Sequence, residues 1–215
     1  MKRDLVIWLY GSGARGDSDD LSDIDVLCIG DIDPDLIAWL RSEPSAHVSE
    51  YTWGEIESMH SYGSLFLLHL TLEGRELFAG EGGRDLFRDL LETLPEYQRS
   101  RCDLEAFRQA LADVDESIRE GGDLAFEAGV ACTVVRHAAI LGCYLIGKPC
   151  FDRRHSLLDC CRATGAGIDP RRVIHTFESL KRRDGKGSPA VDSTLVRDLL
   201  TAGQTLIDRI KECLG

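Results

Sequence analysis

Hydrophobic and polar positions follow two different patterns in the two parts of the chain. Up to about residue 98, short apolar runs alternate with polar turns and short amphipathic stretches. Strands are predicted where residues are continuously apolar or alternate in polarity, at 5–10, 24–29, 47–52 and 76–78. Helical spacing of apolar residues predicts helices at 33–41, 64–72 and 84–94. Thr52 with Glu55 three residues later predicts a capping box that starts another helix.

The rest of the chain has helical spacing throughout. Helices are predicted at residues 104–119, 124–146, 155–163, 170–182 and 193–214. Segment 124–146 is the most apolar and is long enough to span a membrane. It contains Glu127, Arg136 and His137, however, and such side chains are costly in lipid. We therefore predict the core helix of a bundle and no membrane partner.

These patterns predict an α+β chain. A small mixed-sheet domain is expected over residues 1–98 and an all-α helical bundle over residues 99–215. A length of 215 residues with 43% hydrophobic content is enough for two small cores. The net charge of −12 argues against non-specific DNA binding. Residues 1–100 hold 8 Lys/Arg against 20 Asp/Glu, whereas the remaining residues hold 17 of each. This asymmetry indicates different tasks for the two parts.

Eight cysteines occur without any Cys-x-x-Cys pair, and the chain shows no secretory signal pattern. Free thiols of this kind are typical of a reducing compartment. We expect a cytoplasmic protein with reduced cysteines.

Candidate chemistry is concentrated between the first two predicted strands. Asp23 and Asp25 are two residues apart at the start of an apolar run, and side chains at this spacing on a strand share a face. Two adjacent carboxylates repel each other unless a cation lies between them, and oxygen ligands suit Mg²⁺. The turn before them contains Gly11, Ser12 and Gly13, whose backbone N–H groups and hydroxyl suit a phosphate. The combination indicates Mg²⁺-dependent phosphoryl or nucleotidyl transfer.

Residues 11–16 (GSGARG) and 22–25 (SDID), each next to a strand-like run, resemble the nucleotidyltransferase superfamily typified by DNA polymerase β. The similarity is greatest to minimal nucleotidyltransferases and to kanamycin-type aminoglycoside nucleotidyltransferases. Residues 5–29 carry the resemblance. Residues 30–95 match only in the order of elements, and the helical part resembles the bundle of the kanamycin-type enzymes or a HEPN-like partner only in class.

The resemblance implies a set of roles. Two Mg²⁺ ions would be bound by Asp23, Asp25 and a third carboxylate, and the nucleoside triphosphate, with ATP expected, would lie on the glycine turn. The residues implied in nucleotide binding are Gly11, Ser12, Gly13, Arg15 and Ser22. Arg15 has an alternative, an ion pair with Asp17, Asp19 or Asp20.

Glu50 is the candidate for the third carboxylate, because it is the acidic residue of the predicted strand at 47–52. It would act as a metal ligand and general base. A register shift of one residue would turn it to the opposite face of the sheet and leave it facing solvent.

The predicted function is transfer of a nucleoside monophosphate to a hydroxyl acceptor with release of pyrophosphate. The acceptor is left open between a small molecule, a protein and an RNA end, and a homodimer is also left open. The alternative is a non-catalytic nucleotide-binding or partner-binding protein, antitoxin-like or regulatory. We expect the helical part to pack beside the aspartates and present the acceptor. The Arg–His spacing of HEPN ribonucleases does not occur in the helical part, so ribonuclease activity is not predicted.

Overall fold

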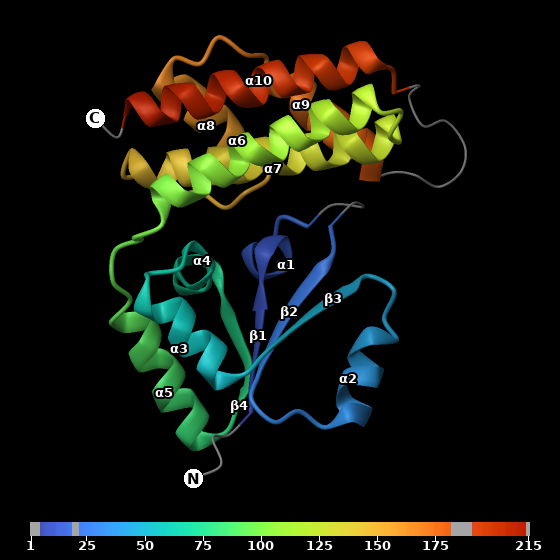
Figure 1. Cartoon of the computed structure of the whole chain (residues 1–215). Coiled ribbons are helices and arrows are strands. Elements are labelled where there is room, and N and C mark those ends of the chain that lie inside the picture. Colours follow the sequence, from blue (N-terminus) through green and yellow to red (C-terminus); the bar gives the residue numbers. More distant parts are fainter. Residues whose placement is uncertain (1–4, 19–21, 182–190, 214–215) are drawn as a thin grey trace. The chain divides into compact units, whose positions relative to one another are not determined.

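The computed structural model describes residues 5–18, 22–181 and 191–213. The chain divides into two compact units, Met1–Arg99 and Ser100–Gly215. We call them the sheet unit and the helical unit (Figure 1). The α+β fold class predicted from the sequence is confirmed.

Within the described residues, the sheet unit contains one sheet of four strands. They are β1 (Val6–Tyr10), β2 (Ile24–Ile29), β3 (Ala46–Tyr51) and β4 (Arg75–Ala79), in the order β3-β2-β1-β4 (Figure 1). β1 is antiparallel to both β2 and β4, whereas β2 and β3 are parallel. The pairing of β1 with β4 is irregular between Ile7 and Trp8. The mixed sheet expected from the hydrophobic pattern is therefore present.

The two faces of the sheet are covered by different helices. On one face, Leu27 and Ile29 of β2 form a core with α3 (Trp53–Ser61), α4 (Leu65–Glu73) and α5 (Glu81–Glu92). Trp53 belongs to this core and the partly buried Trp8 packs against it; both ring systems lie edge-on to Phe87, with centroids 6.4 and 5.0 Å away respectively.

On the other face, Val26 and Cys28 of β2 pack with Ile37 of α2 (Pro34–Arg41). Because successive strand residues point to opposite faces, this division fixes the direction of every side chain on β2.

Local sequence signals explain where several helices begin. Asp33 caps α2 by accepting a hydrogen bond from the Asp35 N–H, and Pro34 occupies the first helical position. The predicted capping box is confirmed, because the Thr52 hydroxyl accepts from the Glu55 N–H and the Glu55 carboxylate accepts from the Thr52 N–H. One segment differs from expectation. Residues predicted as an open glycine turn form the short helix α1 (Gly11–Arg15).

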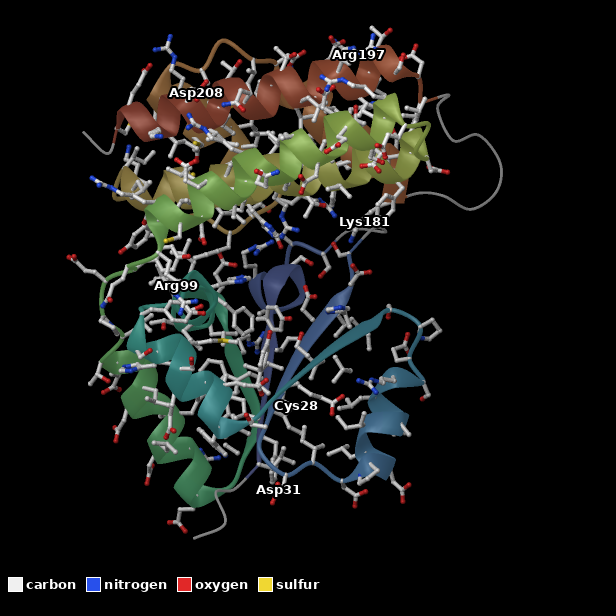
Figure 2. The ribbon with its side chains drawn as sticks, in the orientation of Figure 1. Cys28, Asp31, Arg99, Lys181, Arg197 and Asp208 are labelled. Atoms are coloured by element: carbon white, nitrogen blue, oxygen red, sulfur yellow. The ribbon has the colours of Figure 1, made fainter. Side chains whose placement is uncertain are left out.

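The sheet unit ends at Arg99, which is labelled in Figure 2. Its guanidinium carbon lies 3.7 Å from the centroid of the Tyr62 ring. A cation over an aromatic face is favourable, so this contact ties the end of the unit to the end of α3. Cys28, also labelled, is fully buried in the middle of the sheet.

The described part of the helical unit contains α6 (Ser100–Arg119), α7 (Leu124–Leu145), α8 (His155–Thr164), α9 (Pro170–Lys181) and α10 (Ser193–Glu212). Helix α7 packs against the other four and supplies more buried hydrophobic residues than any of them. Its length and its mean hydropathy of 1.5 over 18 residues would also suit a membrane span. Half of that window is buried inside the protein, as in a core helix.

Candidate functional site

The glycine turn and the aspartate strand meet at the end of β1. Tyr10, the last residue of β1, pairs with Asp25 of β2. The chain then turns at Gly11, which has φ +69°, a conformation that favours glycine. A Cβ added to Gly11 would lie only 2.5 Å from Asp25 Oδ2. The backbone of the turn is therefore packed directly against the Asp25 carboxylate.

The next residues of the turn form one helical turn beside this contact. Ser12 and Gly13 are half-buried in α1. Gly13 packs over Leu9, because a Cβ at this position would lie 3.5 Å from Leu9 Cδ1. Gly16 ends the helix with φ +79° and donates its N–H to the Ser12 carbonyl at 2.9 Å. The turn is thus closed by a backbone hydrogen bond between Gly16 and Ser12, and its first glycine, Gly11, lies at Asp25.

The two aspartates differ in their surroundings. Asp25 lies within β2 on the face of Leu27 and Ile29, and its side chain is 30% exposed. Asp23 is exposed in the segment just before β2, next to the half-buried Ser22. The structure therefore brings Gly11 and Asp25 into contact, whereas Asp23 immediately precedes the first residue of the same strand.

Glu50 does not join this group, which corrects the expectation from the sequence. In the parallel pairing of β2 with β3, Asp25 lies opposite His47 and Cys28 lies opposite Glu50. Glu50 therefore points to the face of Cys28 and α2, away from Asp25. There its carboxylate accepts a hydrogen bond from Arg41 of α2. Because His47 is paired with Asp25, the face of Asp25 carries His47, Ser49 and Tyr51 instead.

His47 is the residue of β3 that approaches Asp25. Its Nδ1 lies 3.8 Å from Asp25 Oδ1, and its side chain is 70% exposed. Ser49, the next residue on this face, shares a hydrogen bond of 3.1 Å with the Tyr10 hydroxyl. The pKa of Tyr10 is raised, chiefly because the phenol is buried and also because Asp25 is near. The sequence did not predict the approach of His47 to Asp25, because that contact depends on the register of β3 against β2.

Arg15 is held by carboxylates of the sheet unit. Its Nε donates to Asp17 at 3.0 Å, the ion pair named as the alternative from the sequence, and its Nη1 donates to Glu73 at 2.6 Å. Asp19 and Asp20 lie outside the described residues. Burial lowers the pKa of Arg15, but the two carboxylates outweigh this and raise it. Glu73 was not expected at the site, and no local pattern pointed to it.

The described carboxylates near the glycine turn are few. Among the described residues, no group of three or more His, Cys, Asp or Glu side chains is arranged as a metal site. Mg²⁺ in nucleotide sites is commonly bound by one or two carboxylates together with substrate phosphates and water. Asp25 beside Gly11, with Asp23 two residues earlier in the chain, supplies carboxylates of the kind that would bind one ion in this way. The third carboxylate expected for a second ion does not face them.

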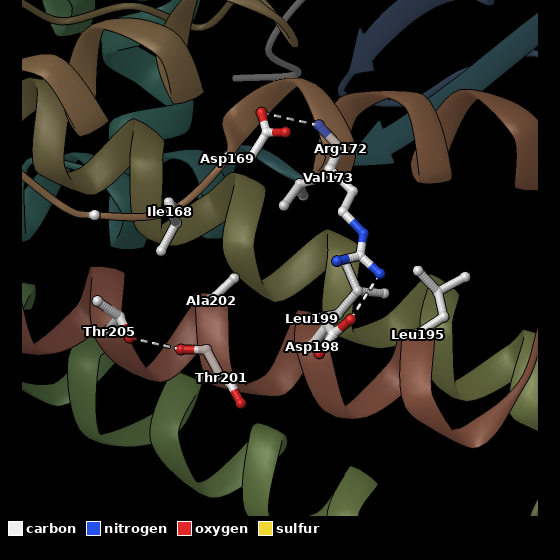
Figure 3. Close-up of a pocket in the computed structure, with 11 residues that line it drawn as sticks. Ile168, Asp169, Arg172, Val173, Leu195, Asp198, Leu199, Thr201, Ala202 and Thr205 are labelled. Atoms are coloured by element: carbon white, nitrogen blue, oxygen red, sulfur yellow. Dashed lines mark hydrogen bonds and ion pairs between the residues drawn. The ribbon is translucent and has the colours of Figure 1, made fainter.

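A separate cavity lies in the helical unit, where the start of α9 packs against α10 (Figure 3). Its volume is about 240 Å³. Val173 of α9 and Leu199 of α10 line it, and Arg172 reaches across from α9 to an ion pair of 2.6 Å with Asp198 on α10. None of the residues implied in nucleotide binding contributes to this cavity, so it is not part of the site described above.

Comparison with known families agrees with the geometry of the sheet unit. Residues 1–62 match the family model described as nucleotidyltransferase domain. The match includes β1, the glycine turn, β2 and β3, and so covers Gly11, Asp25 and Glu50. No curated protein matches the chain.

Among solved structures, the chain is similar to a crystal structure of a toxin–antitoxin with AMP-PNP. The sequences are 22% identical, the TM-score is 0.30, and the match covers 53% of this chain and 86% of that chain.

Proposed function

We propose that the nucleotidyltransferase domain of this chain binds a nucleoside triphosphate with Mg²⁺ and transfers the nucleoside monophosphate to a hydroxyl acceptor. The main observation behind this proposal is the contact between the Gly11 backbone and the Asp25 carboxylate. It joins a turn suited to phosphate directly to a ligand suited to the accompanying cation. The family match over residues 1–62 supports the same class of reaction.

Each residue of the turn has a role in this proposal. The N–H groups of residues 11–13 and the Ser12 hydroxyl donate hydrogen bonds to the β- and γ-phosphates. Asp25 and Asp23 hold one Mg²⁺, which when bound offsets negative charge on the phosphates. The acceptor hydroxyl releases its proton to solvent water, and its oxygen bonds to the α-phosphorus as the bond between that phosphorus and the bridging oxygen breaks and pyrophosphate leaves. Holding the triphosphate in line for this attack is the contribution of the turn.

Charge narrows the choice of acceptor. The first 100 residues carry 12 more acidic than basic residues. A small cationic molecule would be attracted to such a domain, whereas the phosphates of an RNA end would be repelled. We therefore place a cationic hydroxyl compound first, and a protein hydroxyl second.

A second candidate function is nucleotide binding without transfer. The observation that favours it is the position of Glu50 on the face opposite Asp25, paired with Arg41. A site with two carboxylates lacks the general base that the resemblance implies. In this case the protein would act as a regulator that responds to nucleotide.

Two measurements separate these functions. Calorimetry with ATP, CTP, GTP and UTP, each with and without Mg²⁺, tests binding, and ATP with Mg²⁺ is expected to bind. Release of pyrophosphate in the presence of candidate acceptors tests transfer. Binding with no pyrophosphate from any acceptor class favours the regulator, and absence of binding in every condition contradicts both functions. Asp25→Asn is the control that should abolish Mg²⁺-dependent binding.

A further inference from the structure

One face of α4 contacts the residues at both ends of the glycine turn, Tyr10 and Arg15. Phe66, His69 and Glu73 are spaced by three and four residues, so they form a single stripe along the helix. The core residues Leu67 and Leu70 of α4 are fully buried in the sheet unit, which fixes the orientation of the helix. The stripe therefore has a defined position relative to β1 and α1.

The first end of the turn is contacted through aromatic rings. Tyr10 immediately precedes Gly11. Its ring lies edge-on to Phe66, with centroids 5.4 Å apart, and edge-on to His69, with centroids 5.7 Å apart. Edge-to-face contacts of this kind are favourable and directional. The residue that leads into the turn is thus fixed by α4 as well as by Ser49.

The second end of the turn is contacted through charge. Arg15, the last residue of α1, donates to Glu73 at 2.6 Å, and His69 Nε2 lies 2.9 Å from the same Glu73 oxygen. The Glu73 side chain is only 17% exposed and lies at the carboxyl end of α4, where a negative charge is unfavourable. Burial raises the pKa of Glu73, but the hydrogen bonds from His69 and Arg15 outweigh it and lower the pKa.

We propose that α4 acts as a clamp that holds residues 10–15 in the conformation that receives the phosphates, with Glu73 and His69 as positioning residues. The expected effect on phosphate binding rests on the proposed function, but the clamp itself is a property of the nucleotide-free protein. Glu73 binds Arg15, and His69 connects Glu73 to Tyr10, so the two ends of the turn are fixed by one helix. A turn fixed before binding loses less conformational entropy when a phosphate arrives.

A different role for Arg15 predicts the opposite behaviour. If Arg15 contacts phosphate directly, Glu73 competes with the nucleotide for the guanidinium. Removing the charge of Glu73 would then strengthen nucleotide binding. In the clamp, removing that charge loosens the turn and weakens binding.

The variants follow from these contacts. Glu73→Gln removes the charge that binds Arg15, and His69→Phe keeps a ring against Tyr10 while removing the hydrogen bond to Glu73. Glu76→Gln is the matched control. Glu76 is a similarly covered glutamate of β4, and it has two cationic partners, Arg84 and Arg88.

The first measurement needs no nucleotide. Hydrogen–deuterium exchange of a peptide covering residues 10–16 is expected to rise in Glu73→Gln and in His69→Phe, and to match the wild type in Glu76→Gln. Unchanged exchange in Glu73→Gln, with the variant folded, overturns the clamp whatever the nucleotide result. A wild type that binds no nucleotide contradicts the proposed function but leaves this measurement decisive.

The second measurement isolates the phosphate-binding part of affinity. ATP binding with Mg²⁺ is expected to weaken about ten-fold in Glu73→Gln, the order of one charge-assisted hydrogen bond. AMP, which lacks the β- and γ-phosphates, should bind with unchanged affinity. The ratio of the two dissociation constants is a readout that general destabilisation would not change selectively. Tighter ATP binding in Glu73→Gln overturns the clamp in favour of direct phosphate contact by Arg15.

Discussion

Gly11 and Asp25 are in direct contact: a Cβ on Gly11 would lie 2.5 Å from Asp25 Oδ2. Two separate constraints therefore require glycine at this position. One is the positive φ of the backbone, and the other is the space occupied by the carboxylate. The sequence motif consists of residues 11–16 and residues 22–25. The contact between Gly11 and Asp25 brings these two segments together in space.

Replacing Gly11 by alanine should destabilise the sheet unit. The positive φ alone costs a residue with a side chain about 1–2 kcal/mol, and the clash with Asp25 adds an overpacking cost of about 1–3 kcal/mol. Gly16→Ala is the control, because Gly16 also has a positive φ but would find no atom within 4 Å of an added Cβ. Urea denaturation should show a larger loss for Gly11→Ala. Equal losses would contradict the contact with Asp25.

Neutralising the aspartates should separate metal binding from folding. Asp23→Asn and Asp25→Asn are each expected to abolish Mg²⁺-dependent nucleotide binding in calorimetry. Without metal, removing one of two like charges relieves repulsion, so the melting temperature in EDTA should be unchanged or raised. A clear fall in that temperature would show that these carboxylates stabilise the fold and do not serve a metal.

Glu50→Gln should leave nucleotide binding unchanged, because Glu50 faces α2 and not Asp25. Its loss of stability should be under about 1 kcal/mol, the usual range for an exposed ion pair such as that with Arg41. The comparison is with Asp25→Asn in the same calorimetric series. Loss of Mg²⁺-dependent binding in both variants would return Glu50 to the metal site.

Acidification should weaken the sheet unit through Glu73. The pKa of this carboxyl is lower in the folded protein than its ordinary value, because His69 and Arg15 donate hydrogen bonds to it despite its burial. The stability that it contributes is complete above the unfolded pKa of about 4.3, and is lost as the pH falls through the lower folded pKa.

Urea denaturation at a series of pH values measures this effect. The fall in unfolding free energy below about pH 5 should be shallower in Glu73→Gln than in the wild type. Glu92→Gln, at an exposed position at the end of α5, provides the comparison. Identical acid slopes for Glu73→Gln and the wild type would show that the carboxyl does not couple to folding.

Residues 1–99 should fold and bind nucleotide when expressed alone, because their cores form within the sheet unit. If the helical unit presents the acceptor, the isolated sheet unit should bind ATP but fail to release pyrophosphate. Calorimetry and pyrophosphate release on the truncated and full-length proteins distinguish the outcomes. Full transfer by the truncated protein would assign the helical unit another role.

The sequence was sufficient for features that depend on local pattern. The apolar run at residues 24–29 became β2, and the Thr52–Glu55 pair became a capping box, because both signals act within a few residues. The glycine motif was also identified, and Gly11 lies beside Asp25 as the proposed chemistry requires. Its helical form was missed, because five residues are too few to show a period.

Features that depend on register or on distant partners could not be predicted. Glu50 was assigned to the wrong face because strand parity changes with a shift of one residue, and no local signal sets the register of β3 against β2. Besides the local Asp17, Arg15 donates to Glu73, which is 58 positions away in the chain. Only the packing of α4 beside the turn brings them together, and no periodicity in either segment encodes that contact.

The distribution of tryptophan gives the protein a built-in optical probe of one unit. Trp8, Trp39 and Trp53 account for all three tryptophans of the chain, and all belong to the sheet unit. Trp8 and Trp53 are packed in its core, whereas Trp39 is 70% exposed on α2. Intrinsic tryptophan fluorescence will therefore report the unfolding of the sheet unit alone, while far-ultraviolet circular dichroism is weighted toward the long helices of the helical unit. Two transitions that do not coincide would reveal units that melt independently.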